Sequence, residues 1–190
     1  MREVRPKPAV LAWLETLEER CLLTVDWTGA GDGVSWGDPA NWNTDAVPVA
    51  TDDVVINPGT TSSIVISAST GDVTVHSLTG SDALEINGSN LTVTSTSTIT
   101  GALTIDGGGL IATGAATTLT ASGATTATSG SLDANSGAAL DLSGLSTISD
   151  SNNLSIAADG AGSAVALANL TTFTSYYQSS TLSATNGGLV

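Results

Sequence analysis

Three tryptophans, Trp27, Trp36 and Trp42, lie close together near the start of the chain, and Asn41 lies beside the last of them. Flat aromatic rings next to amides and carboxylates can stack on sugars and hydrogen-bond to their hydroxyls. The same indoles could instead close one end of a hydrophobic core, with their N–H groups donating to loop carbonyls. We favour this cap interpretation, and we keep a glycan contact formed by Trp27, Trp36, Asn41 and Trp42 as the alternative.

Asp45, Asp52 and Asp53 follow the tryptophans and could suggest a glycoside hydrolase. Hydrolysis needs two carboxylates that face each other across the glycosidic bond, about 5–10 Å apart. On a stack of repeats such a pair would come from neighbouring repeats, about 20 residues apart in sequence. Asp45 and Asp52 are much closer to each other along the chain than that. We therefore predict no catalytic residue and a protein that is not an enzyme.

His76 is the one histidine of the chain, and we expect it at an outward strand position with a solvated side chain. A zinc site needs several histidine or cysteine ligands, but Cys21 is the one cysteine and is far away in sequence. A Ser-His-Asp triad would have to use His76, and no Gly-x-Ser-x-Gly turn occurs. Neither zinc chemistry nor serine hydrolysis is predicted.

Calcium is the one cation that the composition leaves open. Aspartates expected at the turns between strands offer hard oxygen ligands, and they are Asp106, Asp133, Asp141, Asp150 and Asp159. These carboxylates are widely spread along the chain, and no Gly-Gly-x-Gly-x-Asp nonapeptide accompanies them. We predict no resident cofactor, with calcium as a minor alternative.

The charge distribution excludes two classes of partner. The chain has 190 residues and a net charge of −14, and its four basic residues, Arg2, Arg5, Lys7 and Arg20, all lie near its start. Nucleic-acid binding requires clustered cations, so we exclude it. No apolar run approaches the roughly 18 residues that span a bilayer, so we expect no transmembrane segment.

The elements that would position these residues are short strands in an internal repeat. Residues 140–148 match residues 165–173 position for position, and leucines of apolar-x-apolar pairs recur at similar intervals at Leu91, Leu110, Leu132, Leu154 and Leu182. Period-two pairs separated by Gly, Asn, Asp and Ser are typical of strands with one buried face. Their recurrence without helical segments predicts an all-β, right-handed parallel β-helix with about 20–25 residues per coil. We expect about seven coils.

Two other fold classes fit the composition less well. A β-sandwich would need tight Asn-Gly or Asp-Gly hairpins between strands of equal length, and these are scarce. Disorder is disfavoured because the apolar residues recur in a fixed order.

Three zones follow along the chain. Residues 1–24 are predicted to form a short amphipathic helix that serves as a sorting or export segment, residues 25–58 a Trp-rich capping segment, and residues 59–190 solenoid repeats. Val190 aligns with Leu140, at the start of a strand, so we expect the repeat to continue beyond it.

Leu17, Glu18, Glu19, Arg20, Cys21, Leu22 and Leu23 together resemble the Leu-Glu-Pro-Arg-x-Leu-Leu motif of large surface proteins of planctomycete bacteria. Glu19 stands where that motif has proline. The resemblance implies a sorting motif formed by Leu17, Glu18, Glu19, Arg20, Leu22 and Leu23.

The next stretch, from Trp27 to Ile56, resembles the segment that leads into the first coils of autotransporter- and hemagglutinin-like β-helical surface proteins. It shares with them the order Trp-x-Gly, Trp, Asn-Trp, Pro and Asp-x-Val-x-Ile. The resemblance implies a secreted or surface-displayed rod that acts as an adhesin, structural or display segment. Its partners would be extracellular polysaccharide or other cell-surface proteins. A carbohydrate-binding or carbohydrate-degrading β-helix is the alternative function.

Overall fold

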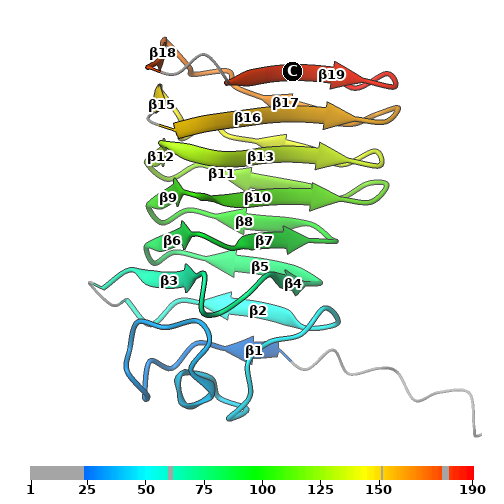
Figure 1. Cartoon of the computed structure of the whole chain (residues 1–190). Coiled ribbons are helices and arrows are strands. Elements are labelled where there is room, and N and C mark those ends of the chain that lie inside the picture. Colours follow the sequence, from blue (N-terminus) through cyan, green and yellow to red (C-terminus); the bar gives the residue numbers. More distant parts are fainter. Residues whose placement is uncertain (1–23, 60–61, 151, 177–179) are drawn as a thin grey trace, which may run out of the picture.

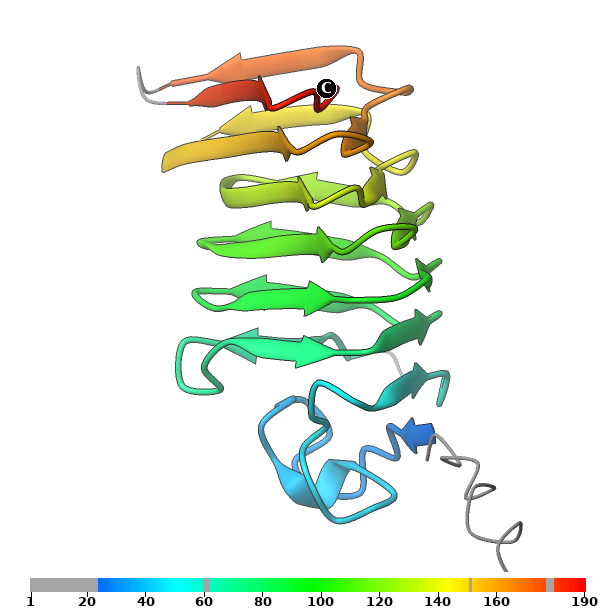
Figure 2. The same ribbon diagram turned by 90° about the vertical axis from the view of Figure 1, so that its right-hand side faces the viewer.

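The structure is a computed structural model that describes residues 24–59, 62–150, 152–176 and 180–190. It is an all-β parallel solenoid of about six turns (Figure 1). Each turn contributes strands to three faces, and successive turns stack along one axis, as the rotated view also shows (Figure 2). The register pair Leu110–Leu132 has the spacing that the sequence predicted, whereas the pair Ile156–Leu182 spans 26 residues, more than the 20–25 expected per coil. The solenoid has about six turns where seven were expected.

All pairs between named strands are parallel, which rules out the β-sandwich. The first face is a seven-stranded sheet of β1 (Thr24–Asp26), β2 (Asp53–Ile56), β5 (Ser77–Gly80), β8 (Ser97–Ile99), β11 (Thr118–Ala121), β14 (Ala139–Asp141) and β17 (Ala164–Ala166). The second is a six-stranded sheet of β4 (Val73–Val75), β7 (Asn90–Val93), β10 (Gly108–Thr113), β13 (Ser129–Asn135), β16 (Asn152–Asp159) and β19 (Thr181–Thr185). The third face carries β3 (Ile64–Ser67), β6 (Leu84–Asn87), β9 (Leu103–Asp106) and β12 (Thr125–Ala127), followed by the pair β15 (Thr147–Asp150) and β18 (Thr172–Ser175). One 3-10 helix, η1 (Pro39–Asn41), lies between β1 and β2.

The interior consists of ladders of like residues, as the repeat predicted. Leu91 pairs with Leu110 and Leu110 with Leu132, and all three side chains are fully buried. Alternate residues of these strands point outward, because strand side chains alternate between faces. The match between residues 140–148 and 165–173 is confirmed, since Leu140 pairs with Val165 in the next coil.

The prediction that Leu154 continues the leucine ladder is wrong by two residues. Leu132 pairs with Ile156, and Leu154 pairs with Gly130. The register shifts after Ser129, where Asn153 forms an extra residue with a φ of 60°. Such a bulge is invisible to a pattern search because it preserves the apolar-x-apolar form while displacing it along the chain.

The backbones of successive coils approach each other closely at one corner, where glycines occupy equivalent positions and form a column along the rod. A Cβ added at Gly123 would lie 2.0 Å from the carbonyl oxygen of Gly101, and one added at Gly144 would lie 1.7 Å from that of Gly123. No side chain fits between these backbones. The glycines of this column therefore allow the coils to stack here.

The predicted N-terminal helix and the sorting motif at residues 17–23 lie outside the described residues. Within the part of the chain that the structure describes, no helix has the length and apolar character needed to cross a membrane.

Candidate functional site

The three tryptophans of residues 25–58 pack against one another at the N-terminal end of the solenoid. Trp42 is in the middle, with its ring centroid 4.9 Å from that of Trp27 and 4.8 Å from that of Trp36. Both contacts are edge-to-face, the arrangement that the charge distribution of aromatic rings favours. None of the three is more than 4% exposed, and all belong to the same hydrophobic core as the coils. No ring face is open for a sugar to stack on, which supports the cap interpretation.

The indole N–H groups differ in their partners. Trp42 Nε1 donates to the Trp36 carbonyl oxygen at 2.9 Å, as the cap interpretation expects. Trp27 Nε1 and Trp36 Nε1 are buried without an acceptor among the described residues, so the expected bonds to loop carbonyls form at one indole of three. Burial of an unpaired donor costs about 1–3 kcal/mol. The large apolar area of each ring offsets that cost.

Asn41 is fully buried and organises the loop around the tryptophans. Its Oδ1 accepts from the backbone N–H groups of Gly31 and Gly33, at 2.9 and 3.0 Å. Its Nδ2 donates to Asp32 Oδ1 and to the Ser35 carbonyl oxygen, at 2.8 and 2.9 Å. One side chain thus uses both of its donors and its acceptor to fix a turn of the loop. The sequence predicted Asn41 as a glycan contact or as part of the cap, but it did not predict that this side chain fixes the turn of the loop.

Asp32 and Asp38 support the same loop. Asp32 Oδ1 accepts from the Ser35 N–H and the Val34 N–H, and these bonds, with that from Asn41, hold the pKa of the carboxyl below its ordinary value. Asp38 Oδ1 accepts from Ala40 N–H and caps η1, while its Oδ2 accepts from Asp32 N–H at 3.0 Å. The two carboxylates are therefore tied to backbone donors in the same loop.

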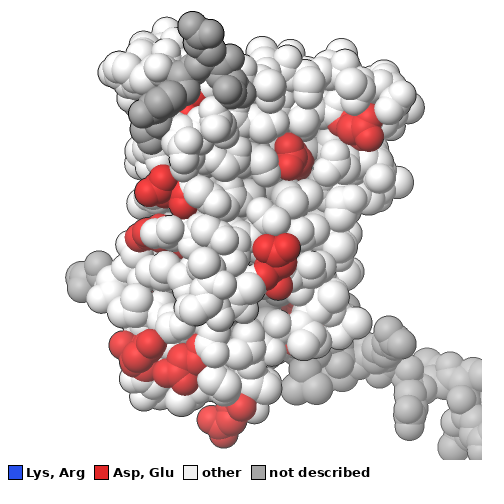
Figure 3. Space-filling view, in the orientation of Figure 1, with Lys and Arg blue, Asp and Glu red and all other residues white. Residues whose placement is uncertain are grey.

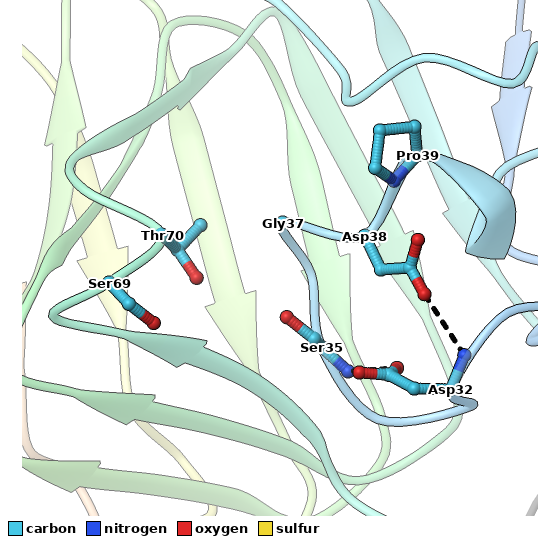
Figure 4. A pocket seen from close by; sticks show the side chains of 7 residues that line it. All are labelled: Asp32, Ser35, Gly37, Asp38, Pro39, Ser69 and Thr70. Carbon is cyan, nitrogen blue, oxygen red and sulfur yellow. Dashed lines mark hydrogen bonds between the residues drawn. The ribbon is translucent and has the colours of Figure 1, made fainter.

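An open cleft of about 380 Å³ lies between this loop and the turn after β3 (Figure 4). Its walls are polar: Asp32, Ser35, Gly37, Asp38 and Pro39 come from the loop, and Ser69 and Thr70 come from the turn. Hydroxyl and carboxylate groups face each other across it, whereas the tryptophans are absent from its lining residues. The sequence drew attention to the tryptophans of this region, but the tertiary structure brings residues 69–70 opposite the loop.

The three aspartates considered for hydrolysis lie in different surroundings. Asp45 lies in an exposed turn with a φ of 53°, and Asp52 Oδ2 accepts from Val49 N–H at 2.8 Å. Asp53 begins β2 and accepts hydrogen bonds from Ser77 Oγ and His76. Asp52 thus has a partner in its own turn, whereas the partners of Asp53 come from the next coil.

The prediction that His76 lies within a strand is wrong, whereas its side chain is partly exposed to solvent, as expected. His76 lies at the corner between β4 and β5, and its Nδ1 is 2.8 Å from Asp53 Oδ1, with the two side chains 40% and 26% exposed. The Ser77 hydroxyl contributes most to lowering the Asp53 pKa, and the His76 hydrogen bond and charge lower it further. Ser77 donates to Asp53 and not to the imidazole, so these three residues lack the serine-to-histidine bond of a triad. Stacking of consecutive coils created this contact, because Asp53 and His76 are 23 residues apart.

On the face drawn in Figure 3, acidic side chains are spread over several parts of the rod. Four of the aspartates end strands, next to the turns where they were predicted: Asp106, Asp141, Asp150 and Asp159. Asp133 lies inside β13, so its placement at a turn was wrong. Burial raises the pKa of Asp133. Among the described residues, no group of three or more histidine, cysteine, aspartate or glutamate side chains comes together as a metal site would require.

No protein-family model, curated protein or solved structure gives a match to this chain. The resemblances stated for residues 17–23 and for the stretch from Trp27 to Ile56 therefore stay predictions.

Proposed function

We propose that the chain is a non-enzymatic, right-handed β-solenoid rod that acts as an adhesin, structural or display segment at the cell surface. The observation that carries this proposal is the uninterrupted core, in which fully buried side chains fill successive coils from Trp36 to Ile156. A filled interior leaves the outward faces as the surface on which the rod meets partners. A right-handed course is proposed because crossovers between parallel strands have that hand in almost all proteins.

The surface composition supports an extracellular role. From residue 21 onward the chain has no lysine or arginine, and its outward strand positions are rich in serine and threonine. Such a chain offers no cleavage site for trypsin-like proteases there. We infer that residues 17–23 direct export and that polysaccharide or other surface proteins are the partners.

Cell fractionation tests this proposal. An antibody against residues 62–150 is used to blot surface, medium and cytosolic fractions of the source cells. Signal in the surface or medium fraction is expected, and its loss in a Leu22→Asp, Leu23→Asp double variant would link export to the motif. A matched Thr104→Asp variant, changed on an outward strand position, should keep the wild-type distribution. Wild-type protein confined to the cytosol would refute the proposal.

A carbohydrate-binding function is the second candidate, and the polar cleft favours it over the buried indoles. Asp38, Ser69 and Thr70 offer hydroxyl and carboxylate groups of the kind that bind sugar hydroxyls. A glycan array of the whole chain tests this candidate. A preferred oligosaccharide whose binding is lost in Thr70→Ala but kept in Thr126→Ala would favour it, because Thr126 is an outward residue of β12. If the array shows no preferred sugar, the carbohydrate-binding candidate is rejected and the rod proposal is the one that stands.

A further inference from the structure

The outward residues on three neighbouring strands of the first face are all serine or threonine. These strands are β5, β8 and β11, which follow one another in the order of the seven-stranded sheet (Figure 1). Each strand, with the residues directly before and after it, presents three outward side chains, because side chains alternate between faces. None of the nine is buried. We call them the hydroxyl array, and they are Ser77, Thr79, Ser81, Thr96, Thr98, Thr100, Thr118, Thr120 and Ser122.

The hydroxyl array is a regular grid because the register of these strands has no shift. Thr79 pairs with Thr98, and Thr98 pairs with Thr120. The ladder continues past the strand ends, where the Thr100 N–H donates to the Gly80 carbonyl oxygen at 2.8 Å. Neighbouring strands lie about 4.8 Å apart, and alternate residues of one strand lie about 6.6 Å apart. The array therefore repeats in two directions, with these two spacings.

The central column of the hydroxyl array is available to a ligand. The Oγ1 atoms of Thr79, Thr98 and Thr120 have no hydrogen-bond partner within the described part of the chain. By contrast, the hydroxyl of the buried Thr117 donates to the Thr94 carbonyl oxygen at 2.8 Å. Threonine is branched at Cβ, which restricts its χ1 angle and limits the directions that its hydroxyl and methyl groups can take. The central hydroxyls are thus both free and preorganised.

The hydroxyl array is uncharged, although the chain carries a net charge of −14. The other two faces have carboxylates at outward strand positions, such as Glu85 in β6 and Asp133 in β13. On the first face, Val55 lies next to the central column on one side and Asp141 lies next to it on the other. A cationic partner would favour the acidic parts of the rod, and an anionic partner would be repelled. The charge of the array is therefore complementary to an uncharged ligand.

A grid that repeats in two directions matches a ligand that also repeats in two directions. The prism faces of ice repeat their oxygen atoms at two distances close to those of the grid. Because the array has only three strands, the small difference between the two lattices does not accumulate. Threonine hydroxyls hydrogen-bond the nearest water layer, and the adjacent methyl groups restrict its orientation. Crystalline polysaccharides repeat as well, but sugar rings stack best on aromatic side chains, and the array has none.

We propose that the hydroxyl array on β5, β8 and β11 is a binding site for the surface of ice. Thr79, Thr98 and Thr120 hold a layer of water close to lattice positions, and this layer joins the crystal. The methyl groups of the same side chains exclude water that does not fit the lattice. The site goes beyond a display role, because it gives the rod itself a ligand.

Partition into growing ice tests the proposal with the whole 190-residue chain. A cooled finger is grown slowly in a dilute solution of the chain mixed with serum albumin as an internal reference. We expect the ratio of chain to albumin to be higher in the ice than in the remaining liquid. A chain that the ice excludes to the same extent as albumin would overturn the proposal.

Substitutions within the hydroxyl array identify the surface. Thr98→Tyr places a bulky ring over the centre of the grid, and we expect it to abolish the enrichment in ice. Thr120→Tyr is an independent second variant, and we expect the same loss. Thr126→Tyr is the matched control, because Thr126 is an outward, exposed residue of β12 on the third face. Circular dichroism selects the variants that keep the fold. Enrichment that survives in a folded array variant, or that disappears in folded Thr126→Tyr, would overturn the proposal.

Crystalline chitin and cellulose test the other repeating ligand. The chain is mixed with each solid and sedimented, and we expect it to stay in solution. Chain that sediments with either solid, but stays in solution as the Thr98→Tyr variant, would assign the hydroxyl array to polysaccharide. That result would overturn the assignment to ice.

Discussion

The two ends of the described solenoid differ in how their outermost coils are covered. At the N-terminal end, Trp36 and Trp42 are 0% and 1% exposed, and a loop fixed by Asn41 covers the first coil. At the C-terminal end, no described residue after Val165 is fully buried, and Leu182 is exposed at a core position. Both ends belong to one continuous stack, so the difference comes from what covers each end and not from the coils themselves.

The coverage of an outermost coil affects how stable that coil is. In a linear stack each coil contacts only its neighbours, so an uncovered coil loses about half of its packing. The N-terminal end, which the loop around Trp36 and Trp42 covers (the closed end), should therefore unfold together with the middle coils. The last described coil, which contains Leu182 (the open end), should fray first. The predictions below test this difference, beginning with the largest expected effect.

Trp36→Ala at the closed end should reduce the free energy of unfolding by about 3–5 kcal/mol, because it removes a fully buried aromatic ring and leaves a cavity against Trp42. Chemical denaturation monitored by circular dichroism measures the loss. A change below about 1 kcal/mol would mean that the ring is not part of the cap.

Ile156→Ala and Leu182→Ala test two neighbouring positions of one interior ladder, the first in β16 and the second in β19 of the last described coil. Ile156 is fully buried and Leu182 is 62% exposed, although the two pair in register. We expect the free energy of unfolding to fall by about 2–4 kcal/mol for Ile156→Ala and by under about 0.5 kcal/mol for Leu182→Ala, measured by chemical denaturation. Similar values at both positions would contradict the idea that the open end is weakly packed.

Gly123→Ala tests the middle of the rod. Its Cβ would lie 2.0 Å from the Gly101 carbonyl oxygen, so the backbones of two coils must separate, and we expect a loss of about 1–3 kcal/mol. Gly80→Ala is the matched control, because a Cβ there would lie 3.7 Å from Ile56 Cβ, an ordinary contact. Thermal unfolding of both variants should separate them clearly, and equal midpoints would exclude a tight glycine column.

Asn41→Ala should reduce the free energy of unfolding by about 1–2 kcal/mol, because it leaves the N–H groups of Gly31 and Gly33 without their acceptor in a partly buried loop. Amide hydrogen exchange should show faster exchange at both glycines while the last coil is unchanged. Asn43→Ala, which removes an exposed pair of bonds to Asp26, is the milder control. A larger effect in the control would contradict the role assigned to Asn41.

Acid should destabilise the closed end because it protonates Asp32. This is the smallest effect on stability that we predict. Hydrogen bonds lower its pKa in the folded state, so the carboxylate stabilises the fold above its unfolded pKa, and this contribution disappears as the pH falls through the lower folded-state pKa. Asp32→Asn should flatten that part of the stability profile for global unfolding. Asp159 also has a lowered pKa, because Thr185 and Asn186 donate to it, so Asp159→Asn should change only hydrogen exchange in the last coil. An effect of Asp159→Asn on global unfolding would show that the two ends unfold together.

The fold class could be predicted from the sequence because its signal is local. Alternation of apolar and polar residues, as in Leu91-Thr92-Val93, fixes which side chains face inward, and its recurrence fixes the stacking of coils. The ladder from Leu91 to Leu132 follows directly from that spacing. The bulge at Asn153 accounts for one residue of the two-residue displacement to Ile156, and it could not be predicted because it has no signature apart from its tolerance of positive φ.

Some features of the candidate site could likewise be predicted from the sequence, and others could not. The sequence by itself determined that Trp27, Trp36, Asn41 and Trp42 lie together, since they are neighbours along the chain, and that no cation accompanies them. Only the tertiary structure decided that the indoles face the core, that Thr70 lies across a cleft from Asp38, and that Asp53 meets His76. The reason is physical: these contacts join residues of different coils, and their partners depend on the register of stacking, which the whole chain sets and no short segment contains.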